Sequence, residues 1–340
     1  MTVRVTGLKG FSIGPVRVDR PVLLAPMSGV TDYPFRRQAW AFGAGLVISE
    51  MVACETLAQG REDVIRRMKG DAGCGPHVIQ LAGREARWMD VGARIAQEAG
   101  ADIIDINMGC PARQVTKGLS GSALMRDLDH AQELIEATIG AVSVPVTVKM
   151  RLGWDHETMN APDLAARAQR AGAAMITVHG RTRQQFYTGQ ADWAAVRAVR
   201  EAITLPLVVN GDIGCPDTAR AALDASGADA VMIGRAAQGR PWLPGAVARA
   251  LMTGERLTEP PLHAGAQSLA EALEDSIALY GEELGVRMMR KHLASFVDWA
   301  VSDPDLAREW RGALCRVRSA ADVHAALKAF VSARQDRDAA

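Results

Sequence analysis

The sequence predicts an α/β protein built as a (β/α)8 barrel of the TIM type, followed by an all-helical C-terminal domain. Eight short apolar runs rich in β-branched residues recur up to residue 235, and segments with helical character lie between several of them. Strands that alternate with helices are typical of βαβ units in a parallel sheet, and eight such units close a barrel of this type. From about residue 262 onward, apolar residues continue at helical spacing without a strand pattern, which indicates helices alone.

Each expected strand is an apolar run that ends in a polar or glycine-containing turn. In chain order the strands are PVLLAPM (21–27), LVISE (46–50), HVIQLAG (77–83), IIDINMG (103–109), VPVTVKMRLG (144–153), MITVHGR (175–181), LPLVVNGD (205–212) and AVMIGR (230–235). Their nearly continuous apolar character indicates that the sheet is covered on its outer face. A doubly wound open sheet is the alternative, but the GxGxxG fingerprint does not follow the first strand.

Helical patterns between these strands occupy residues 84–100, 128–142 and 161–172. The segment TGERLTEPPLHAG (253–265) contains two adjacent prolines and glycines, which indicates a linker. We therefore expect two domains, a barrel over residues 1–250 and a helical domain over residues 262–335.

Composition narrows the class of protein. The 340 residues carry 39 basic and 39 acidic side chains, and this balance argues against a surface that binds nucleic acid everywhere, though not against a local basic groove. The five cysteines are scattered without a CxxC pair, which fits neither a disulfide framework nor a metal site and indicates a reducing compartment. Neither a signal peptide nor a membrane-spanning segment is recognisable. We expect a soluble cytoplasmic protein without a bound metal or a membrane partner, and we take a monomer as the working hypothesis.

In a barrel of this type the chemistry belongs to the C-terminal ends of the strands. Small and polar residues gather at the expected strand ends: Pro26, Met27 and Ser28, then Gln80, Asn107 and Cys110, Lys149 and Arg151, His179 and Arg181, Asn210, Gly211 and Asp212, and finally Gly234 and Arg235. A polar group at such a position is desolvated unless something pairs with it. The pattern therefore predicts a ligand-binding site at this end of the barrel.

The last two strand ends predict a phosphate subsite. Gly211 and Gly234 allow a close approach to backbone N–H groups, and Arg235 adds a guanidinium, at the place where many barrels of this type hold a phosphate. Two ordinary glycine-rich turns are the alternative.

Lys149 lies within the apolar strand VTVKMR (146–151), where a lysine must pair, shift its pKa or take part in chemistry. Three interpretations stay open. The amine forms a Schiff base with a carbonyl substrate, places a positive charge beside an electron-rich ring such as a reduced flavin, or extends to solvent at the barrel mouth. His179 is similarly either a ligand-binding residue or a core histidine.

Eight stretches with distinctive motifs lie at or beside the strand ends. They are LAPMSGVTDYPFRR (24–37), SEMV (49–52), IQLAG (79–83), DINMGCPARQVTKGLSGSALMRD (105–127), VTVKMRLGW (146–154), TVHGRTRQQFYTG (177–189), VVNGDI (208–213) and MIGRAAQGRPW (232–242). In these stretches, and in the helical region after about residue 262, the chain resembles the tRNA-dihydrouridine synthase family. The NMGCPA and KGLSGSAL segments most resemble the bacterial B branch of that family.

This resemblance implies a flavoenzyme with FMN across the barrel mouth. Carried over residue by residue, Pro26, Met27 and Ser28 would contact the isoalloxazine region, with Gln80 and Lys149 at its polar edge. The ribityl chain and phosphate would be held by His179, Asn210, Gly211, Asp212, Gly234 and Arg235. NADPH, or NADH, would reduce the flavin, which would pass hydride to C6 of a uracil in the tRNA D-loop. Cys110 would give a proton to C5, and the product would be 5,6-dihydrouridine.

The residues around Cys110 suit this implied reaction. A thiol is mostly protonated at neutral pH and adds no negative charge beside a reduced flavin, although a cysteine without a chemical role is the alternative. The target base must leave the tRNA stack to reach the pocket. Asn107 is expected to read the Watson–Crick edge of uracil. Arg151 and Arg181 are expected to hold that edge or the adjacent phosphate, and Lys117 to contact the RNA backbone.

A local cationic surface is expected in the helical domain. Arg287, Arg290 and Lys291 are spaced i, i+3 and i+4, so they are predicted to share one helix face and to bind tRNA phosphates. A solvated helix face is the alternative.

Three rival functions fit parts of the same pattern. They are an FMN barrel that reduces a small molecule, a flavin-free lyase that uses Lys149 as a Schiff base, and a tRNA-binding protein without catalysis. The helical domain and the basic face disfavour the first, because a small substrate needs neither. A yellow protein whose reduced flavin is oxidised by tRNA would exclude the other two.

Overall fold

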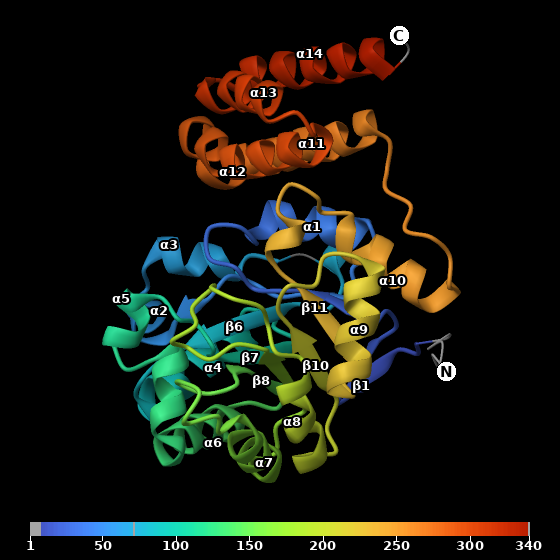
Figure 1. The fold of residues 1–340 in the computed structure, drawn as a ribbon. Helices are drawn as coiled ribbons and strands as arrows, with labels where there is room; N and C mark the ends of the chain where they lie inside the picture. Colours follow the sequence, from blue (N-terminus) through green and yellow to red (C-terminus); the bar gives the residue numbers. More distant parts are fainter. Residues whose placement is uncertain (1–7, 71, 339–340) are drawn as a thin grey trace, which may run out of the picture.

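The computed structural model describes residues 8–70 and 72–338 of the chain. At its centre is a parallel sheet, and the connecting helices lie around its outer face (Figure 1). The parallel strands are β3 (Val22–Leu24), β4 (Leu46–Val47), β5 (Val52–Ala53), β6 (Val78–Ala82), β7 (Ile103–Met108), β8 (Val146–Arg151), β9 (Met175–His179), β10 (Leu207–Asn210) and β11 (Ala230–Ile233).

The sheet closes into a barrel. Its strand order is β4-β3-β11-β10-β9-β8-β7-β6-β5, with parallel pairing throughout. Ile48 forms a parallel bridge with Val78, and the Ser49 N–H donates to the Val78 carbonyl at 3.0 Å, so the strand that begins with β4 also pairs with β6. The predicted barrel architecture is therefore confirmed.

The second strand differs from its prediction. A single strand over residues 46–50 is expected, but the structure divides it into β4 and β5. In the break, the Ser49 hydroxyl donates to the Glu50 carbonyl at 2.9 Å, and the Glu50 carboxylate accepts from the N–H of Gly29, which lies 21 residues earlier in the chain.

The helices around the barrel are α1 (Tyr33–Ala41), α2 (Cys54–Ala58), α3 (Glu62–Ile65), α4 (Ala86–Glu98), α5 (Arg113–Lys117), α6 (Leu128–Ala141), α7 (Ala161–Ala171), α8 (Arg197–Ala202), α9 (Pro216–Ser226) and α10 (Leu243–Thr253). Their starts follow local chemistry. The Asp32 carboxylate accepts a hydrogen bond from the Phe35 N–H at the start of α1, and Asp127 does the same for His130 at the start of α6. Both are standard N-cap arrangements.

A short antiparallel hairpin, β1 (Phe11–Ile13) and β2 (Val16–Val18), precedes the barrel. Ile13 and Val18 are fully buried in the same apolar cluster as Leu23 and Ile103. The hairpin therefore covers the N-terminal end of the barrel, which leaves the opposite end for ligands.

The alternation of side chains along the strands decides which residues point into the barrel. Successive side chains point to opposite faces of a strand. In β7, Ile103 belongs to the cluster inside the barrel, whereas Ile104 and Ile106 belong to the cluster between the sheet and its helices. Asp105 and Asn107 therefore point into the barrel, farther along the strand than Ile103.

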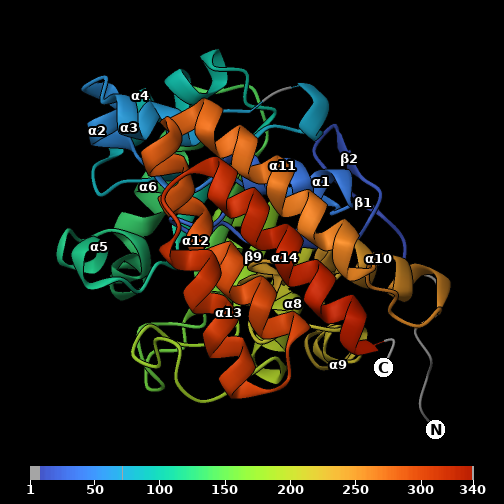
Figure 2. The same ribbon diagram turned by 90° about the horizontal axis from the view of Figure 1, so that it is seen from above.

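Four helices follow the barrel: α11 (Leu262–Tyr280), α12 (Glu282–Ala300), α13 (Pro304–Arg316) and α14 (Ala320–Asp338). They form a separate layer next to α1, and the view from above shows them lying over the barrel (Figures 1 and 2). This layer has its own apolar core, centred on Phe296, Leu269 and Leu293, which Trp242 of the barrel joins. Leu262 begins the first of these helices, at the position where the sequence predicts the helical region to start. None of the described helices combines the length and apolar character that a bilayer crossing requires.

Candidate active site at the barrel mouth

The interior positions at the C-terminal ends of the strands are polar. The alternation described for β7 also holds in the neighbouring strands: the apolar residues of β6, β9 and β10 divide between the same two clusters, and every second residue of β8 belongs to the outer one. The side chains that it directs into the barrel mouth are Gln80, Asp105, Asn107, Thr147, Lys149, Arg151, Thr177, His179 and Asn210. Most of the residues predicted from strand ends are thus brought to one place.

A chain of hydrogen bonds runs across the floor of this mouth. The carboxylate of Asp105 accepts from the Thr147 hydroxyl at 2.6 Å and from Nε2 of Gln80 at 2.7 Å. Oε1 of Gln80 accepts from Nδ2 of Asn107 at 2.7 Å. Oδ1 of Asn107 accepts from the N–H groups of Gly109 and Cys110 at 3.1 and 2.9 Å. Burial raises the pKa of Asp105 to about 6, although the bonds from Thr147 and Gln80 lower it.

This network corrects the role expected for Asn107. Its amide oxygen already accepts two loop N–H groups, and its nitrogen is bound to Gln80, so little of the amide is left to read a uracil edge. Asn107 instead shapes the loop that carries Cys110. Gln80 is likewise only 1% exposed, which places it under the mouth with little surface for a ligand.

Cys110 itself is half-buried at the edge of the mouth, between β7 and α5. The carbonyl of Cys110 accepts from both the hydroxyl and the N–H of Ser122, at 2.9 and 3.1 Å. Lys149 and Arg151 lie close enough to interact electrostatically with the thiol. Hydrogen bonds between Cys110 and Ser122 therefore hold the loop that carries the thiol, and two cations lie beside it.

Four cations surround His179. Burial lowers the pKa of His179 well below 6.5, and the charges of Arg151, Lys149, Arg181 and Arg235 lower it further. The imidazole is therefore neutral at pH 7. A mouth with this excess of positive charge favours an anionic ligand.

Lys149 is held inside the mouth. Its Nζ donates to Oδ1 of Asn210 at 3.2 Å, and Nδ2 of Asn210 donates to the Met232 carbonyl at 2.8 Å. Burial lowers the pKa of Lys149 to about 8, and Arg151 contributes, while Asp105 acts in the opposite direction. The interpretation that this side chain extends to solvent does not fit these contacts.

The two strand-end arginines have structural partners rather than free guanidinium groups. Arg151 donates to the carbonyls of Gly109, Thr182 and Phe186 at 2.8 to 2.9 Å. Arg151 therefore supports the Cys110 loop.

Arg181 is 1% exposed. It donates to the Thr188 and Gly189 carbonyls and to both carboxylate oxygens of Asp212, at 2.5 to 3.1 Å. The expectation that Arg181 holds the uracil edge or a phosphate is therefore wrong; it ties the loop after β9 to the turn after β10.

The turn after β10 has the features of a phosphate cradle. A Cβ at Gly211, where φ is +117°, would lie 2.7 Å from Cβ of Ala191 and 3.3 Å from Nε2 of His179, so only glycine fits. Nδ1 of His179 is buried and has no hydrogen-bond partner among the described residues. Arg235 is largely exposed at the same rim and lies 3.4 Å from Asp212.

The side chain of Asp212 lies between Arg181 and Arg235. Burial acts to raise its pKa, but the hydrogen bonds from Arg181 and the Ala191 N–H and the charge of Arg235 outweigh burial, so the pKa is lowered. The carboxylate is thus already paired with Arg181 and the Ala191 N–H of the protein itself.

The ends of the first and last strands adjoin. Sδ of Met27 lies 3.7 Å from the position of a Cβ on Gly234. The Met27 N–H donates to the Thr31 hydroxyl at 2.8 Å, which fixes the turn that also carries Pro26 and the exposed Ser28. These residues form one wall of the mouth.

The observed donors fit FMN. A buried imidazole nitrogen without a partner, a glycine cradle and Arg235 suit a phosphate and a polyhydroxy chain. Lys149 and the neighbouring cations suit a ring that becomes negatively charged on reduction. Within the described residues, no group of three or more His, Cys, Asp or Glu side chains is arranged to hold a metal ion.

The basic residues of α12 do not share one exposed face. Arg287 is exposed, but Arg290 donates to the Val317 carbonyl at 3.2 Å and Lys291 to the Gly29 carbonyl. The prediction of a single basic face from all three is wrong, because two of the side chains are used inside the molecule. Lys117, in contrast, is exposed at the end of α5.

An aromatic pair at the mouth was missed. Phe186 and Tyr187 are 43% and 45% exposed and pack edge to face, with ring centroids 4.6 Å apart. The guanidinium of Arg235 lies 4.8 Å from the centroid of the Tyr187 ring. Two adjacent exposed aromatics in a glycine-ended loop after a strand are the signal that could have found them.

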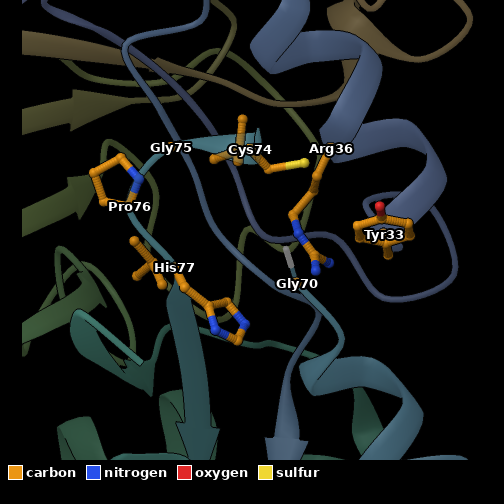
Figure 3. A pocket seen from close by; sticks show the side chains of 9 residues that line it. Tyr33, Arg36, Gly70, Cys74, Gly75, Pro76 and His77 are labelled. Atoms are coloured by element: carbon orange, nitrogen blue, oxygen red, sulfur yellow. The ribbon is translucent and has the colours of Figure 1, made fainter. Parts of the chain in front are cut away.

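A small hollow lies beside the start of β6 (Figure 3). It is lined by Tyr33, Arg36, Val47, Gly70, Cys74, Gly75, Pro76, His77 and Val78, and its volume is about 10 Å³. That is room for about one water molecule. That hollow is therefore too small for a substrate or a cofactor.

Solved structures with similar folds place the chain among α/β-barrel proteins. 2-Naphthoyl-CoA reductase is 13% identical, with a TM-score of 0.57 over 75% of this chain and 54% of that one. The old yellow enzyme homologue from Zymomonas mobilis is 16% identical, with a TM-score of 0.53 over 76% of this chain and 96% of that one. At these identities the likeness concerns the fold alone. The fold and the site together define an α/β-barrel protein with a cationic strand-end pocket.

The chain belongs to the dihydrouridine synthase family, whose model matches residues 23–335. It is 50% identical to a probable tRNA-dihydrouridine synthase of Rhodobacter capsulatus, over 97% of this chain and 99% of that protein. It is 40% identical to tRNA-dihydrouridine synthase B of Pseudomonas aeruginosa, over 95% of this chain and 96% of that protein. The resemblance inferred from the motifs, including that to the B branch, is confirmed.

Proposed function

We propose that this protein reduces uridine in tRNA to 5,6-dihydrouridine in the cytoplasm, with FMN in the barrel mouth and NADPH or NADH as the reductant. The observation that carries the proposal is the Cys110 thiol, held beside Lys149 and Arg151 at the edge of a cationic mouth. Membership of the dihydrouridine synthase family supports it.

Different residues of this chain would bind different parts of FMN. His179, Gly211, Gly234 and Arg235 would receive the phosphate and ribityl chain. Met27 would lie against the ring and Lys149 at its polar edge. When bound, FMN would supply the hydride that the uracil C6 requires.

Cys110 would provide the proton for C5 of the uracil. The hydrogen bonds from its N–H to Asn107 and from Ser122 to its carbonyl fix the backbone on both sides of the thiol. General acid catalysis needs this placement, because the proton must be within hydrogen-bond reach of the reacting atom. Arg151 would act through the same loop, by holding the Gly109 carbonyl.

The RNA would be bound by groups that remain exposed around the mouth. Phe186 and Tyr187 offer ring faces to nucleobases, and stacking of a base on an aromatic ring contributes about 1–3 kcal/mol. Lys117 on the Cys110 loop and Arg287 on α12 would contact phosphates. The helical layer would thus bind tRNA while the barrel carries out the reduction.

Cys110→Ala tests this function directly. The variant is expected to retain FMN and its reduction by NADPH, but to lose most of the oxidation by tRNA, since a proton donor typically contributes about 10²–10⁴-fold. Stopped-flow flavin absorbance follows both half-reactions, and mass spectrometry of the tRNA quantifies dihydrouridine. Cys215→Ala, a half-buried cysteine at the start of α9, is the matched control. Normal dihydrouridine formation by Cys110→Ala would show that another group is the acid, and a colourless wild-type protein would contradict the flavin assignment itself.

A further inference from the structure

One residue in the turn after β3, Gly29, is held from both sides by charged side chains, through its N–H and through its carbonyl. The Gly29 N–H donates to Oε1 of Glu50 at 2.5 Å, and the Gly29 carbonyl accepts a hydrogen bond from Nζ of Lys291. Glu50 lies in the break between β4 and β5, whereas Lys291 lies in the middle of α12. The barrel and the helical layer therefore position Gly29 jointly, two residues beyond Met27.

The charges around Gly29 depend on one another. Asp32 and Glu50 are each 5% exposed. Burial lowers the pKa of the half-buried Lys291, while Asp32 and Glu50 raise it. The hydroxyl of Tyr280 donates to Oδ2 of Asp32 at 3.2 Å, so α11 also takes part. Buried charges are strongly destabilising without a partner. The positive charge of Lys291 therefore stabilises the buried carboxylates of Asp32 and Glu50.

The residue that follows Lys291 ties the same helix to the last strand end. His292 stacks on Phe35 with ring centroids 4.5 Å apart, and its Nδ1 accepts from the Gly239 N–H at 3.4 Å. Burial lowers the pKa of His292 to about 3, so the ring is neutral and able to accept. Gln238 donates to the Lys291 carbonyl at 3.2 Å. Helix α12 thus contacts the turns after both β3 and β11.

We propose that Lys291 is a positioning residue that fixes the 27–30 turn for cofactor binding, and not a contact to tRNA phosphate. This inference rests on the proposed function, in which Met27 of that turn lies against FMN. Arg287 lies four residues earlier on α12 and is exposed, about one helical turn from Lys291. The helix that contacts RNA is therefore joined through one lysine to the wall of the flavin site.

Lys291→Met in the full-length protein separates the two roles, because methionine keeps the length of the side chain without its charge. FMN affinity is expected to fall about tenfold or more, as for the loss of a charge-assisted hydrogen bond. Fluorescence titration of the apoprotein with FMN measures it. Hydrogen exchange of residues 28–31 in the apoprotein is expected to quicken by about tenfold as well, because the Gly29 carbonyl loses its partner.

Two further variants complete the design. Lys291→Arg restores a cationic donor and should recover most of both readouts. Lys328→Met removes an exposed lysine from α14 and should change neither. Filter binding of apoprotein to tRNA at several salt concentrations gives the slope of log affinity against log salt concentration, whose magnitude falls by about one unit for each phosphate that the protein no longer neutralises.

The opposite pattern would overturn the inference: unchanged FMN affinity and exchange in Lys291→Met, with a reduced salt slope for tRNA. If that variant does not fold, Glu50→Gln with Lys291→Met removes both charges, keeps an acceptor for the Gly29 N–H, and should still show faster exchange at the turn. Normal exchange in this double variant would overturn the inference too. A wild-type protein that binds no FMN would defeat the proposed function, whereas the exchange measurement would still test the role of Lys291.

Discussion

Asp32 is a buried carboxylate whose ionised form the fold disfavours. Burial raises its pKa from 3.8 to about 6, and the charge of Glu50 contributes, while the Phe35 N–H and Arg36 lower it. The folded protein thus binds a proton at Asp32 more tightly than the unfolded chain does. Asp32 therefore contributes stability that is fully present below pH 3.8 and is lost as the pH rises through about 6.

Asp32→Asn should remove this pH dependence. Asparagine keeps an oxygen for the Phe35 N–H and is an equally good N-cap. Relative to wild type, the free energy of unfolding of the variant should rise by about 2–3 kcal/mol between about pH 4 and pH 7, the equivalent of a two-unit pKa shift. Urea unfolding of both proteins across this range measures the difference in the free energy of unfolding. The contributions of other titrating groups, such as Asp105, cancel in this difference because both proteins contain them. A difference that stays constant with pH would contradict the assignment.

At this scale the sequence predicted which residues reach the mouth, but not what they bind. Strand ends and residue types are local, so Cys110, Lys149 and His179 could be placed in advance. Hydrogen-bond partners are not local: Arg181 meets Asp212, and Lys291 meets Gly29 from 262 positions away. In the sequence, a polar residue that pairs with another residue of the protein therefore looks the same as one that binds a ligand.

Among the elements, the Cys110 loop depends on one glycine. Gly121 has φ +60°, and a Cβ there would lie 2.8 Å from the Cys110 carbonyl oxygen. Gly121→Ala should therefore displace the thiol and slow oxidation of the reduced enzyme by tRNA by about 10–100-fold, as displacements near 1 Å can do. Single-turnover absorbance measures the rate.

Gly100→Ala is the control for this substitution. Gly100 has φ +87° with nothing within 4 Å of a Cβ, so it shares the left-handed strain of about 1–2 kcal/mol without any contact to the site. Equal tRNA oxidation rates in the two variants would mean that the loop tolerates the displacement.

Elements were predicted best where their patterns are long and regular. The third to eighth strands carry clear apolar runs, and the helices α4, α6 and α7 carry clear helical periodicity, so their positions follow from the sequence. The hairpin β1–β2 was missed because each strand has three residues, too short for a periodic signal. The break between β4 and β5 was also missed, since it is set by the bonds of Ser49 and Glu50 to residues elsewhere.

On the scale of the whole molecule, the start of the helical layer could be predicted, but not its placement. The prolines before Leu262 and the loss of strand pattern mark the boundary in the sequence. Where the helices dock depends on contacts such as that between Lys291 and Gly29, which join distant segments. Consequently, the contact of α12 with the 27–30 turn is visible only in the structure.

Trp242 is the main apolar link between the barrel and the helical layer. It is 2% exposed and packs edge to face with Phe296 and Trp299, at centroid distances of 6.2 and 5.1 Å, and its Nε1 donates to Glu259 at 3.2 Å. Trp242→Ala should lower the free energy of unfolding by about 3–5 kcal/mol, the usual cost of removing a buried aromatic. The layer should also loosen, so tRNA affinity should fall.

Urea unfolding followed by circular dichroism, together with tRNA filter binding, checks both expectations. Trp88→Ala, on α4 and only half-buried, should cost clearly less and leave tRNA affinity unchanged. Because α12 also fixes the 27–30 turn, a loosened layer should weaken FMN binding in Trp242→Ala as well. Full stability with intact FMN and tRNA affinity in that variant would show that polar contacts alone, such as those of Lys291 and His292, hold the helices on the barrel.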